Sequence, residues 1–83
     1  MARVEIYTTS YCSFCVRAKS LLQSKNIEYV EHNLDGKDDE LNALKERTGW
    51  RTVPQIFIDN ELVGGFTELA AKDSKGELDQ LKA

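Results

Sequence analysis

The sequence predicts an α/β fold, with a four-stranded mixed sheet flanked by helices in the order β-α-β-α-β-β-α. In the first half, a strand pattern, a helix pattern and a second strand pattern follow one another, which implies parallel strands joined by a right-handed crossover. In the second half, only Asp59-Asn60 separates two strand patterns, and strands joined by so short a turn are antiparallel. The chain has 83 residues, so we expect one domain, residues 1–83.

The first strand and first helix lie on either side of a short loop. Residues Val4 to Tyr7 mix alternation with β-branched and aromatic side chains, which is typical of a strand. The loop Thr8–Tyr11 follows. Residues Cys12 to Lys25 predict an amphipathic helix, because their apolar side chains recur at helical spacing, at Phe14, Cys15, Ala18, Leu21 and Leu22. Asn26 is the predicted stop of this helix.

The second strand and second helix complete the first half. Residues Ile27 to Glu31 alternate as a strand, and Asn33 to Gly36 form a turn. The second helix is predicted over Lys37–Thr48, because acidic residues fill its first turn and basic residues its last, just before Gly49.

The remaining elements follow the only proline, Pro54. Two strands are predicted at Gln55–Ile58 and Leu62–Val63. Thr67 is predicted to cap a helix that runs to about Lys72. The pattern Ser74-x-x-Glu77 reads as a capping box for a short terminal turn.

The two cysteines carry the chemistry that this sequence suggests. Cys12 and Cys15 are three residues apart at a helix start, so they lie on one face and can close a disulfide with little rearrangement. The unpaired backbone N–H groups and the positive end of the helix dipole favour a thiolate at the first cysteine. We therefore predict that Cys12 is the nucleophile and that Cys15, one turn further in, is the more buried resolving partner.

Zinc binding and a structural disulfide are the alternatives for this pair. A C-x-x-C pair supplies half of many zinc sites, but the chain has no third cysteine. Its only histidine, His32, has no ligand spacing to either cysteine and is assigned no role. A structural disulfide between Cys12 and Cys15 would close a loop too short to stabilise the fold much. Redox function is therefore favoured.

Composition narrows the class of protein. Eleven basic and fourteen acidic residues give a net charge of -3, so nothing favours nucleic acid or an anionic membrane as a partner. No apolar run approaches the roughly 20 residues of a membrane span. We expect a cytoplasmic protein, and in that reducing compartment a C-x-x-C pair is more often catalytic or metal-binding than structural.

Two further segments allow a structural and a functional interpretation. Thr52-Val53-Pro54 is either a proline at the start of a strand or a cis Val53-Pro54 bond that leaves the N–H and C=O of Val53 free to pair with an extended substrate. Gly64-Gly65 is either a turn or a point of close backbone approach before a helix N-terminus, where carboxylates bind. Both interpretations stay open for each segment.

Together these features resemble the glutaredoxin family of the thioredoxin-like fold, over essentially the whole chain. The matching segments are Cys12-Ser13-Phe14-Cys15, Arg51-Thr52-Val53-Pro54 with Gln55-Ile56-Phe57-Ile58, Gly64-Gly65-Phe66-Thr67-Glu68-Leu69 and Ser74-Lys75-Gly76-Glu77-Leu78. The resemblance implies a monomeric, glutathione-dependent thiol-disulfide oxidoreductase with a cis-proline. Its partners would be glutathione and proteins that carry disulfides or glutathione adducts. Thioredoxin itself is a weaker match, because Trp-Cys-Gly-Pro-Cys is absent.

The resemblance also implies roles for individual residues. Val53 would pair with the cysteinyl backbone of glutathione, while Thr67 and Glu68 would hold its γ-glutamyl end. Tyr11 and Arg51 would border the groove. The implied glutathione-binding set is Tyr11, Arg51, Thr52, Val53, Pro54, Thr67 and Glu68.

Two departures from the family pattern affect the expected ligands. Many members carry a lysine shortly before the first cysteine, whereas residues 8–10 here are Thr-Thr-Ser, which leaves Arg51 as the nearby cation. Ser13 stands where proline is common. Members with serine there resemble those that hold a [2Fe-2S] cluster between two protomers, so the alternative function is a cluster-binding homodimer in which Cys12 and glutathione thiols are the ligands.

Overall fold

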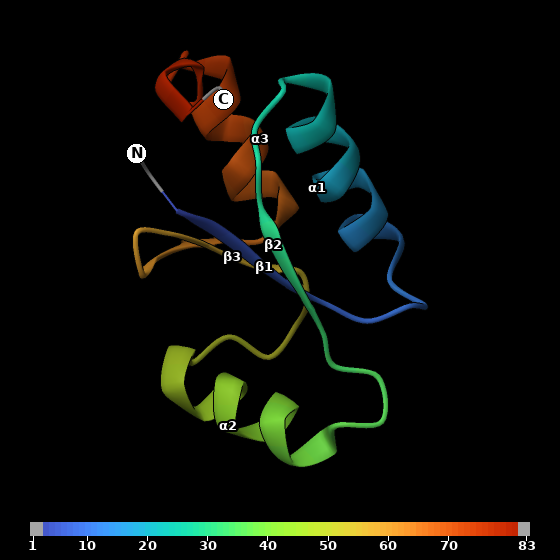
Figure 1. Cartoon of the computed structure of the whole chain (residues 1–83). Helices are drawn as coiled ribbons and strands as arrows, with labels where there is room; N and C mark the ends of the chain where they lie inside the picture. Colours follow the sequence, from blue (N-terminus) through green and yellow to red (C-terminus); the bar gives the residue numbers. More distant parts are fainter. Residues whose placement is uncertain (1–2, 82–83) are drawn as a thin grey trace.

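The fold is a four-stranded sheet between two helical layers. The computed structural model describes residues 3–81, with Gln80 by its backbone alone. In chain order the elements are β1 (Val4–Thr8), α1 (Ser13–Ser24), β2 (Val30–Asn33), α2 (Asp38–Thr48), β3 (Gln55–Ile58), β4 (Glu61–Gly64), α3 (Phe66–Ser74) and the 3-10 turn η1 (Asp79–Leu81). Helices α1 and α3 cover one face of the sheet and α2 covers the other (Figure 1).

The sheet has the mixed topology that the sequence predicts. Its spatial order is β2-β1-β3-β4. Strand β1 pairs in parallel with β2 and antiparallel with β3, and β3 pairs antiparallel with β4. The predicted parallel pairing of the first two strands and the predicted hairpin are therefore confirmed. Strand β1 lies inside the sheet and leads directly into the loop before α1, so the C-x-x-C segment starts from a rigid element.

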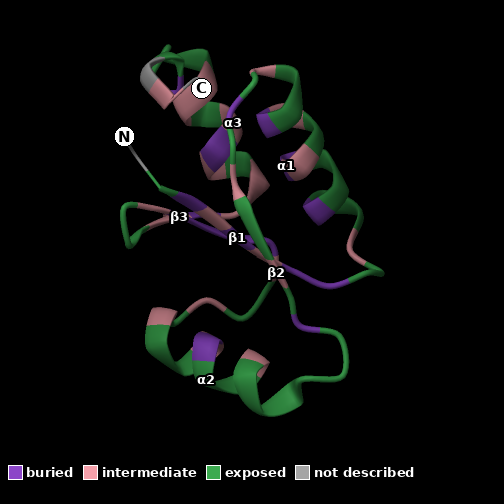
Figure 2. Cartoon of the chain, in the orientation of Figure 1, coloured by how far each residue is buried: buried purple, intermediate pink, exposed green. Residues whose placement is uncertain are grey.

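The core has two parts, one on each face of the sheet (Figure 2). The larger part lies under α1 and α3, where buried residues of the sheet meet Ala18, Leu22 and Leu69. The smaller part lies under α2, where Leu44 packs with Leu34 and Phe57. Burial on both faces explains the nearly continuous apolar run in β3.

The second strand is the main correction to the predicted boundaries. The prediction was Ile27–Glu31, whereas β2 spans Val30–Asn33 and pairs with β1 from Glu5↔Val30 onward. Asn26 adopts φ 58°, and the N–H of Ile27 bonds to Leu22 O at 3.0 Å, so both residues end α1, as predicted for Asn26. Ile27 is buried in the core instead of pairing in the sheet.

The helix ends show which capping signals operate. Gly49 ends α2 in the left-handed conformation, as its position predicted. The N-cap predicted at Thr67 is wrong, because the chain already turns at Gly64 and α3 begins at Phe66 with Gly65 as its N-cap. The capping box predicted from Ser74 is also wrong. Ser74 is the last residue of α3, and the carboxylate of Glu77 accepts instead from Lys72 Nζ at 3.2 Å.

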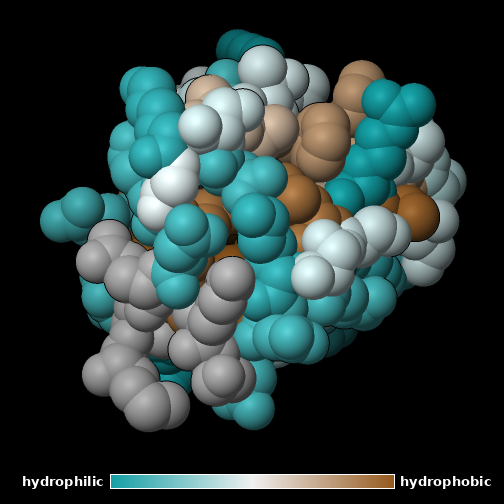
Figure 3. Space-filling model, turned by 90° about the horizontal axis from the view of Figure 1, so that it is seen from above, coloured by the Kyte–Doolittle hydropathy of each residue, from teal (hydrophilic) through white to brown (hydrophobic). Residues whose placement is uncertain are grey.

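The surface over the α1–α3 layer is mostly hydrophilic, with hydrophobic residues visible between the polar ones (Figure 3). Within residues 3–81, no helix combines the length and the apolar character needed to cross a membrane.

Candidate active site

Cys12 is the N-cap residue of α1. Its backbone is extended, at φ -101° and ψ 108°, and its sulfur accepts a hydrogen bond from the N–H of Cys15 at 3.1 Å. An N-cap side chain normally satisfies such an orphan N–H with oxygen, and here sulfur takes that place. Negative charge on the sulfur would strengthen this bond and interact favourably with the helix dipole. The predicted position of Cys12 at a helix N-terminus is confirmed, and its role as the nucleophile stays a prediction.

The Cys12 thiol also contacts the loop before Pro54. Its Sγ donates to the backbone carbonyl of Val53 at 3.4 Å. The Val53–Pro54 bond is cis, as the functional interpretation of this segment expects. The Val53 carbonyl thus accepts one hydrogen bond within the fold, and because a carbonyl oxygen has two lone pairs, pairing of Val53 with an extended substrate stays a prediction.

Cys15 lies in a different environment from Cys12. Both cysteines are free thiols, Cys12 partly exposed and Cys15 only 1% exposed. Burial, and then the hydrogen bond with Cys12, raise the pKa of Cys15 to about 12, against smaller lowering effects of the Thr9 backbone and the Lys19 charge. Cys15 is therefore a thiol at neutral pH. The prediction that it is the more buried partner is confirmed.

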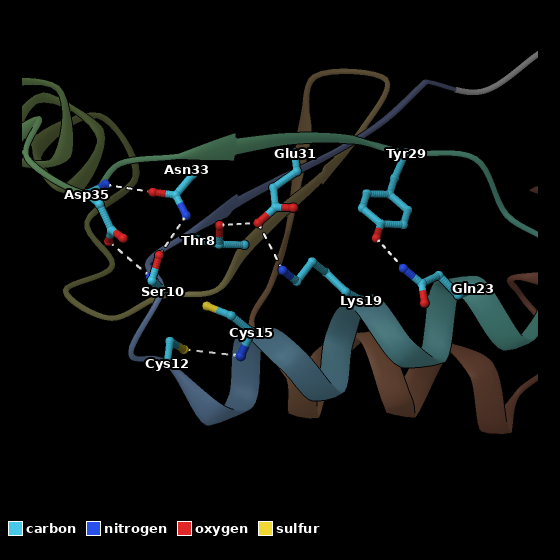
Figure 4. A network of polar contacts seen from close by, with 10 residues as sticks. All are labelled: Thr8, Ser10, Cys12, Cys15, Lys19, Gln23, Tyr29, Glu31, Asn33 and Asp35. Atoms are coloured by element: carbon cyan, nitrogen blue, oxygen red, sulfur yellow. Dashed lines mark hydrogen bonds and ion pairs between the residues drawn. The ribbon is translucent and has the colours of Figure 1, made fainter.

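Polar contacts fix the loop that leads into Cys12 (Figure 4). The carboxylate of Asp35 accepts from the N–H of Ser10 at 3.0 Å, and Asn33 Nδ2 donates to the Ser10 hydroxyl at 3.2 Å. Hydrogen bonds from the hydroxyl and then the backbone of Ser10 hold the pKa of Asp35 below its usual value. Ser10 therefore anchors the loop to the segment after β2.

A buried glutamine holds the loop that carries Val53. Gln55 is fully buried, and its Nε2 donates to Trp50 O at 3.0 Å and to Thr52 O at 3.2 Å. Its Oε1 accepts from the Thr48 hydroxyl at 2.9 Å. Three bonds from one side chain thus connect the end of α2 to the proline segment. No sequence pattern indicates this role, because a glutamine at the start of a strand usually faces solvent.

A groove of about 390 Å³ lies beside the proline segment. It is lined by Phe14, Trp50, Thr52, Val53, Pro54, Gly65, Phe66, Thr67 and Glu68. Five members of the predicted glutathione-binding set therefore come together in one hollow: Thr52, Val53, Pro54, Thr67 and Glu68. The three aromatic side chains of the groove, Phe14, Trp50 and Phe66, are not among the residues predicted to bind glutathione. The rings of Phe14 and Phe66 stack with centroids 6.3 Å apart, and the guanidinium of Arg17 lies over Phe14.

Gly64 allows close packing of the groove wall. A Cβ atom at Gly64 would lie 2.8 Å from Trp50 Cη2 and 2.8 Å from Glu68 Cγ, and the residue has φ +127°. The Glu68 carboxylate accepts from the N–H of Gly65 at 2.9 Å and so helps to cap α3. Close backbone approach is therefore the right interpretation of this glycine, and the groups that approach are the protein's own side chains.

The other two members of the predicted binding set lie outside the groove lining. Tyr11 is 85% exposed. Arg51 is exposed and lines a separate hollow with Lys45 and Gly49 at the end of α2. Their roles at the border of the groove stay predictions.

Metal ligands are scarce in the described part of the chain. Among residues 3–81, no group of three or more His, Cys, Asp or Glu side chains could hold a metal ion. His32 pairs with the carboxylate of Glu5 at 2.9 Å and stacks on Tyr7. A [2Fe-2S] cluster would take one thiolate, that of Cys12, from each chain and its other two ligands from glutathione thiols. Cluster binding therefore stays a prediction from the resemblance.

Comparisons with known proteins agree with this geometry. The glutaredoxin family model matches residues 4–63. The chain is 47% identical over 81 residues to glutaredoxin 3 of Escherichia coli, covering 98% of each chain. It is also 47% identical over 83 residues to a probable glutaredoxin of Synechocystis, covering 99% of this chain and 76% of that one.

Solved structures show the same fold. A buckwheat glutaredoxin-glutathione complex superposes with a TM-score of 0.89 at 28% identity, covering 99% of this chain and 83% of that one. The holo form of glutaredoxin C1 from Populus gives a TM-score of 0.87 at 34% identity, covering 96% and 75%. With its partly exposed Cys12 and buried Cys15 beside a cis-proline, the chain belongs to the glutaredoxin family of thiol-disulfide oxidoreductases.

Proposed function

We propose that this protein is a monomeric cytoplasmic enzyme that reduces glutathione mixed disulfides and protein disulfides with glutathione as the electron donor. The observation that carries the proposal is the position of the Cys12 sulfur. It sits at the N-terminus of α1 and 3.4 Å from the backbone carbonyl of Val53, which lines the groove. The similar buckwheat protein was solved as a complex with glutathione, which supports the same ligand here.

The first step is attack by Cys12 on a mixed disulfide. The Cys12 thiolate bonds to the glutathione sulfur, the substrate's disulfide bond breaks, and the substrate leaves as a thiolate that takes a proton from water. The product is a disulfide between Cys12 and glutathione. The bond from the Cys15 N–H stabilises the thiolate before the attack and orients its sulfur.

The groove supplies the binding energy for the glutathione moiety. The backbone of Val53 pairs with the backbone of the cysteinyl residue, because the Val53 carbonyl oxygen has a second lone pair besides the one that the Cys12 thiol contacts. The first turn of α3, with Thr67 and Glu68, receives the γ-glutamyl end, where backbone N–H groups favour a carboxylate. Tyr11 and Arg51 complete the border of the site. The aromatic side chains Phe14, Trp50 and Phe66 complete the lining of the groove.

The adduct is resolved by one of two thiols. A second glutathione attacks the bound glutathione sulfur, which yields glutathione disulfide and the Cys12 thiolate. Alternatively, Cys15 attacks Cys12 and expels glutathione, which is the route needed for protein disulfides. Because burial raises the pKa of Cys15, the route through glutathione is favoured at neutral pH.

The test is reduction of a glutathionylated peptide, coupled to glutathione reductase, by the wild type and the Cys12→Ser and Cys15→Ser variants. We expect Cys12→Ser to lower the rate to background and Cys15→Ser to retain most of it. With a protein disulfide as substrate, both variants should be impaired. Substantial peptide reduction by Cys12→Ser would refute the proposed nucleophile.

A further inference from the structure

A polar unit lies beside Cys15, between α1 and the strands. Lys19 is one turn after Cys15 on α1, and its Nζ is 3.0 Å from Glu31 Oε2 on β2. The Thr8 hydroxyl donates to the same carboxylate oxygen at 2.7 Å. In Figure 4 the Cys15 sulfur and the Lys19 ammonium both point from α1 toward the strands. The ion pair therefore lies on the side of the helix that the resolving thiol faces.

The resolving step has a physical difficulty that this unit addresses. Attack on a disulfide requires a thiolate, and burial, the largest of the effects that raise the pKa of Cys15, disfavours this charged form. The positive charge of Lys19 acts in the opposite direction and lowers the pKa of Cys15. Reciprocally, the Cys15 thiolate contributes to raising the pKa of Lys19, after the larger effects of Glu31 and Tyr29. The two groups are thus electrostatically linked.

We propose that Lys19, held in place by Glu31 and Thr8, is a positioning residue for the resolving step and stabilises the Cys15 thiolate as it attacks the Cys12–glutathione disulfide. The proposal rests on the proposed function, because it concerns the second half of that reaction. Lys19 keeps its proton and touches neither substrate nor the reacting Cys12 sulfur. Glu31 offsets part of its charge, so this pair sets how fast the adduct closes to the Cys12–Cys15 disulfide.

The step balances without any further reactant. The Cys15 thiol loses a proton to solvent, and its sulfur bonds to Cys12 Sγ while the bond between Cys12 and glutathione breaks. Glutathione leaves as a thiolate and takes up a proton. One disulfide is exchanged for another, so no external oxidant or reductant is needed.

Other charges near Cys15 are few or already paired. Cys12, the N-cap of α1, is part of the disulfide during this step, and the nearby polar groups of β1 and the loop after it are the Thr8 hydroxyl and the Thr9 backbone. On α3, which packs against α1, the charged residues bond elsewhere: Glu68 to the Gly65 N–H, Lys72 to Glu77 and Asp73 to Lys25. The Lys19–Glu31 pair is therefore the unit to perturb.

Removing the charge of Lys19 and removing the charge of Glu31 should change the rate of closure in opposite directions. Lys19→Met removes the cation and should slow closure about three- to tenfold at pH 7, with the pH dependence of closure displaced to higher pH. Glu31→Gln removes the offsetting anion and should speed closure about two- to fivefold. Lys19→Arg should restore most of the wild-type rate. A purely structural ion pair would make both charge-removing variants slower together.

The experiment is rapid mixing of the reduced protein with glutathione disulfide, acid quenching, and mass spectrometry of the Cys12 adduct and the internal disulfide from pH 6 to 9. Lys25→Met is the matched control, because Lys25 lies at the other end of α1 and pairs with Asp73 at 2.6 Å. Adduct formation should be unchanged in every variant, so the effect is confined to closure.

Two results would overturn the inference. One is that Lys19→Met closes the Cys12–Cys15 disulfide at the wild-type rate at every pH. The other is that Glu31→Gln slows closure as much as Lys19→Met does. If the wild type forms no adduct on Cys12, the proposed function itself fails, and this inference fails with it. The Glu31→Gln result decides the question even if Lys19→Met does not fold.

Discussion

Replacing Gly64 with alanine tests how the groove wall is built. The new Cβ would lie 2.8 Å from both Trp50 Cη2 and Glu68 Cγ, closer than such atoms pack. Both neighbours line the groove, so neither can move without changing the site. We therefore expect a loss of stability together with weaker substrate binding.

The magnitude follows from three contributions. A non-glycine residue at φ +127° costs about 1–3 kcal/mol. Overpacking against two side chains costs about 1–3 kcal/mol more. Alanine restricts the unfolded chain, which returns about 0.4–1 kcal/mol. The net expectation is a loss of about 1–6 kcal/mol in the free energy of unfolding, and the midpoint of about 3 kcal/mol corresponds to roughly 12–24 °C in Tm for a domain of this size.

Gly36→Ala is the matched control. Gly36 also has a positive φ, +71°, but a Cβ there would meet nothing within 4 Å. Its cost should stay near 1 kcal/mol. Urea unfolding gives both free energies, and steady-state kinetics with a glutathionylated peptide gives KM, which should rise for Gly64→Ala alone. If the two variants lose equal stability, the close packing around Gly64 does not have the assigned role.

Two further predictions concern buried or paired polar groups. Hydrogen bonds from Thr8 and then Lys19 hold the pKa of Glu31 below its usual value. The ionised carboxylate therefore stabilises the fold fully above its unfolded pKa of about 4.3, and this contribution is lost as the pH falls through the lower folded pKa. In urea unfolding at pH 7, 5, 4 and 3, the stability advantage of the wild type over Glu31→Gln should shrink below about pH 4.5; an advantage independent of pH would contradict the assignment. Gln55→Leu leaves the carbonyls of Trp50 and Thr52 without their donor and should cost about 2–4 kcal/mol, whereas the exposed Gln23→Leu should cost about 0.5 kcal/mol or less. Equal effects of the two leucine variants in the same unfolding assay would show that Gln55 does not hold the loop.

Local patterns predicted the elements well where one signal acted alone. Gly49 after a helix with basic residues in its last turn ends α2, and Asp59-Asn60 joins two antiparallel strands, with both residues at positive φ. The strand at Ile27–Glu31 was misplaced because alternation there competes with helix termination. Ile27 serves the end of α1 and the core, which only the packed structure decides.

The site was predictable where residue type and position together imply the chemistry. Cys12 at a helix N-terminus follows from the spacing and the strand before it. Trp50 was missed, because a single aromatic residue in a loop has no periodicity to place it, although its proximity to Pro54 in the sequence was a usable signal. The Lys19–Glu31 pair joins α1 to β2 and depends on the register of the crossover, which the sequence does not specify.

The measurement that tests the central claim most directly is peptide mapping of the Cys15→Ser variant after brief treatment with one equivalent of glutathione disulfide at pH 7. We predict one glutathione per chain, attached to Cys12, whereas Cys12→Ser treated in parallel should stay unmodified at the buried Cys15. An unreactive Cys12, or equally rapid modification of Cys15, would contradict the assignment of Cys12 as the nucleophile that meets glutathione.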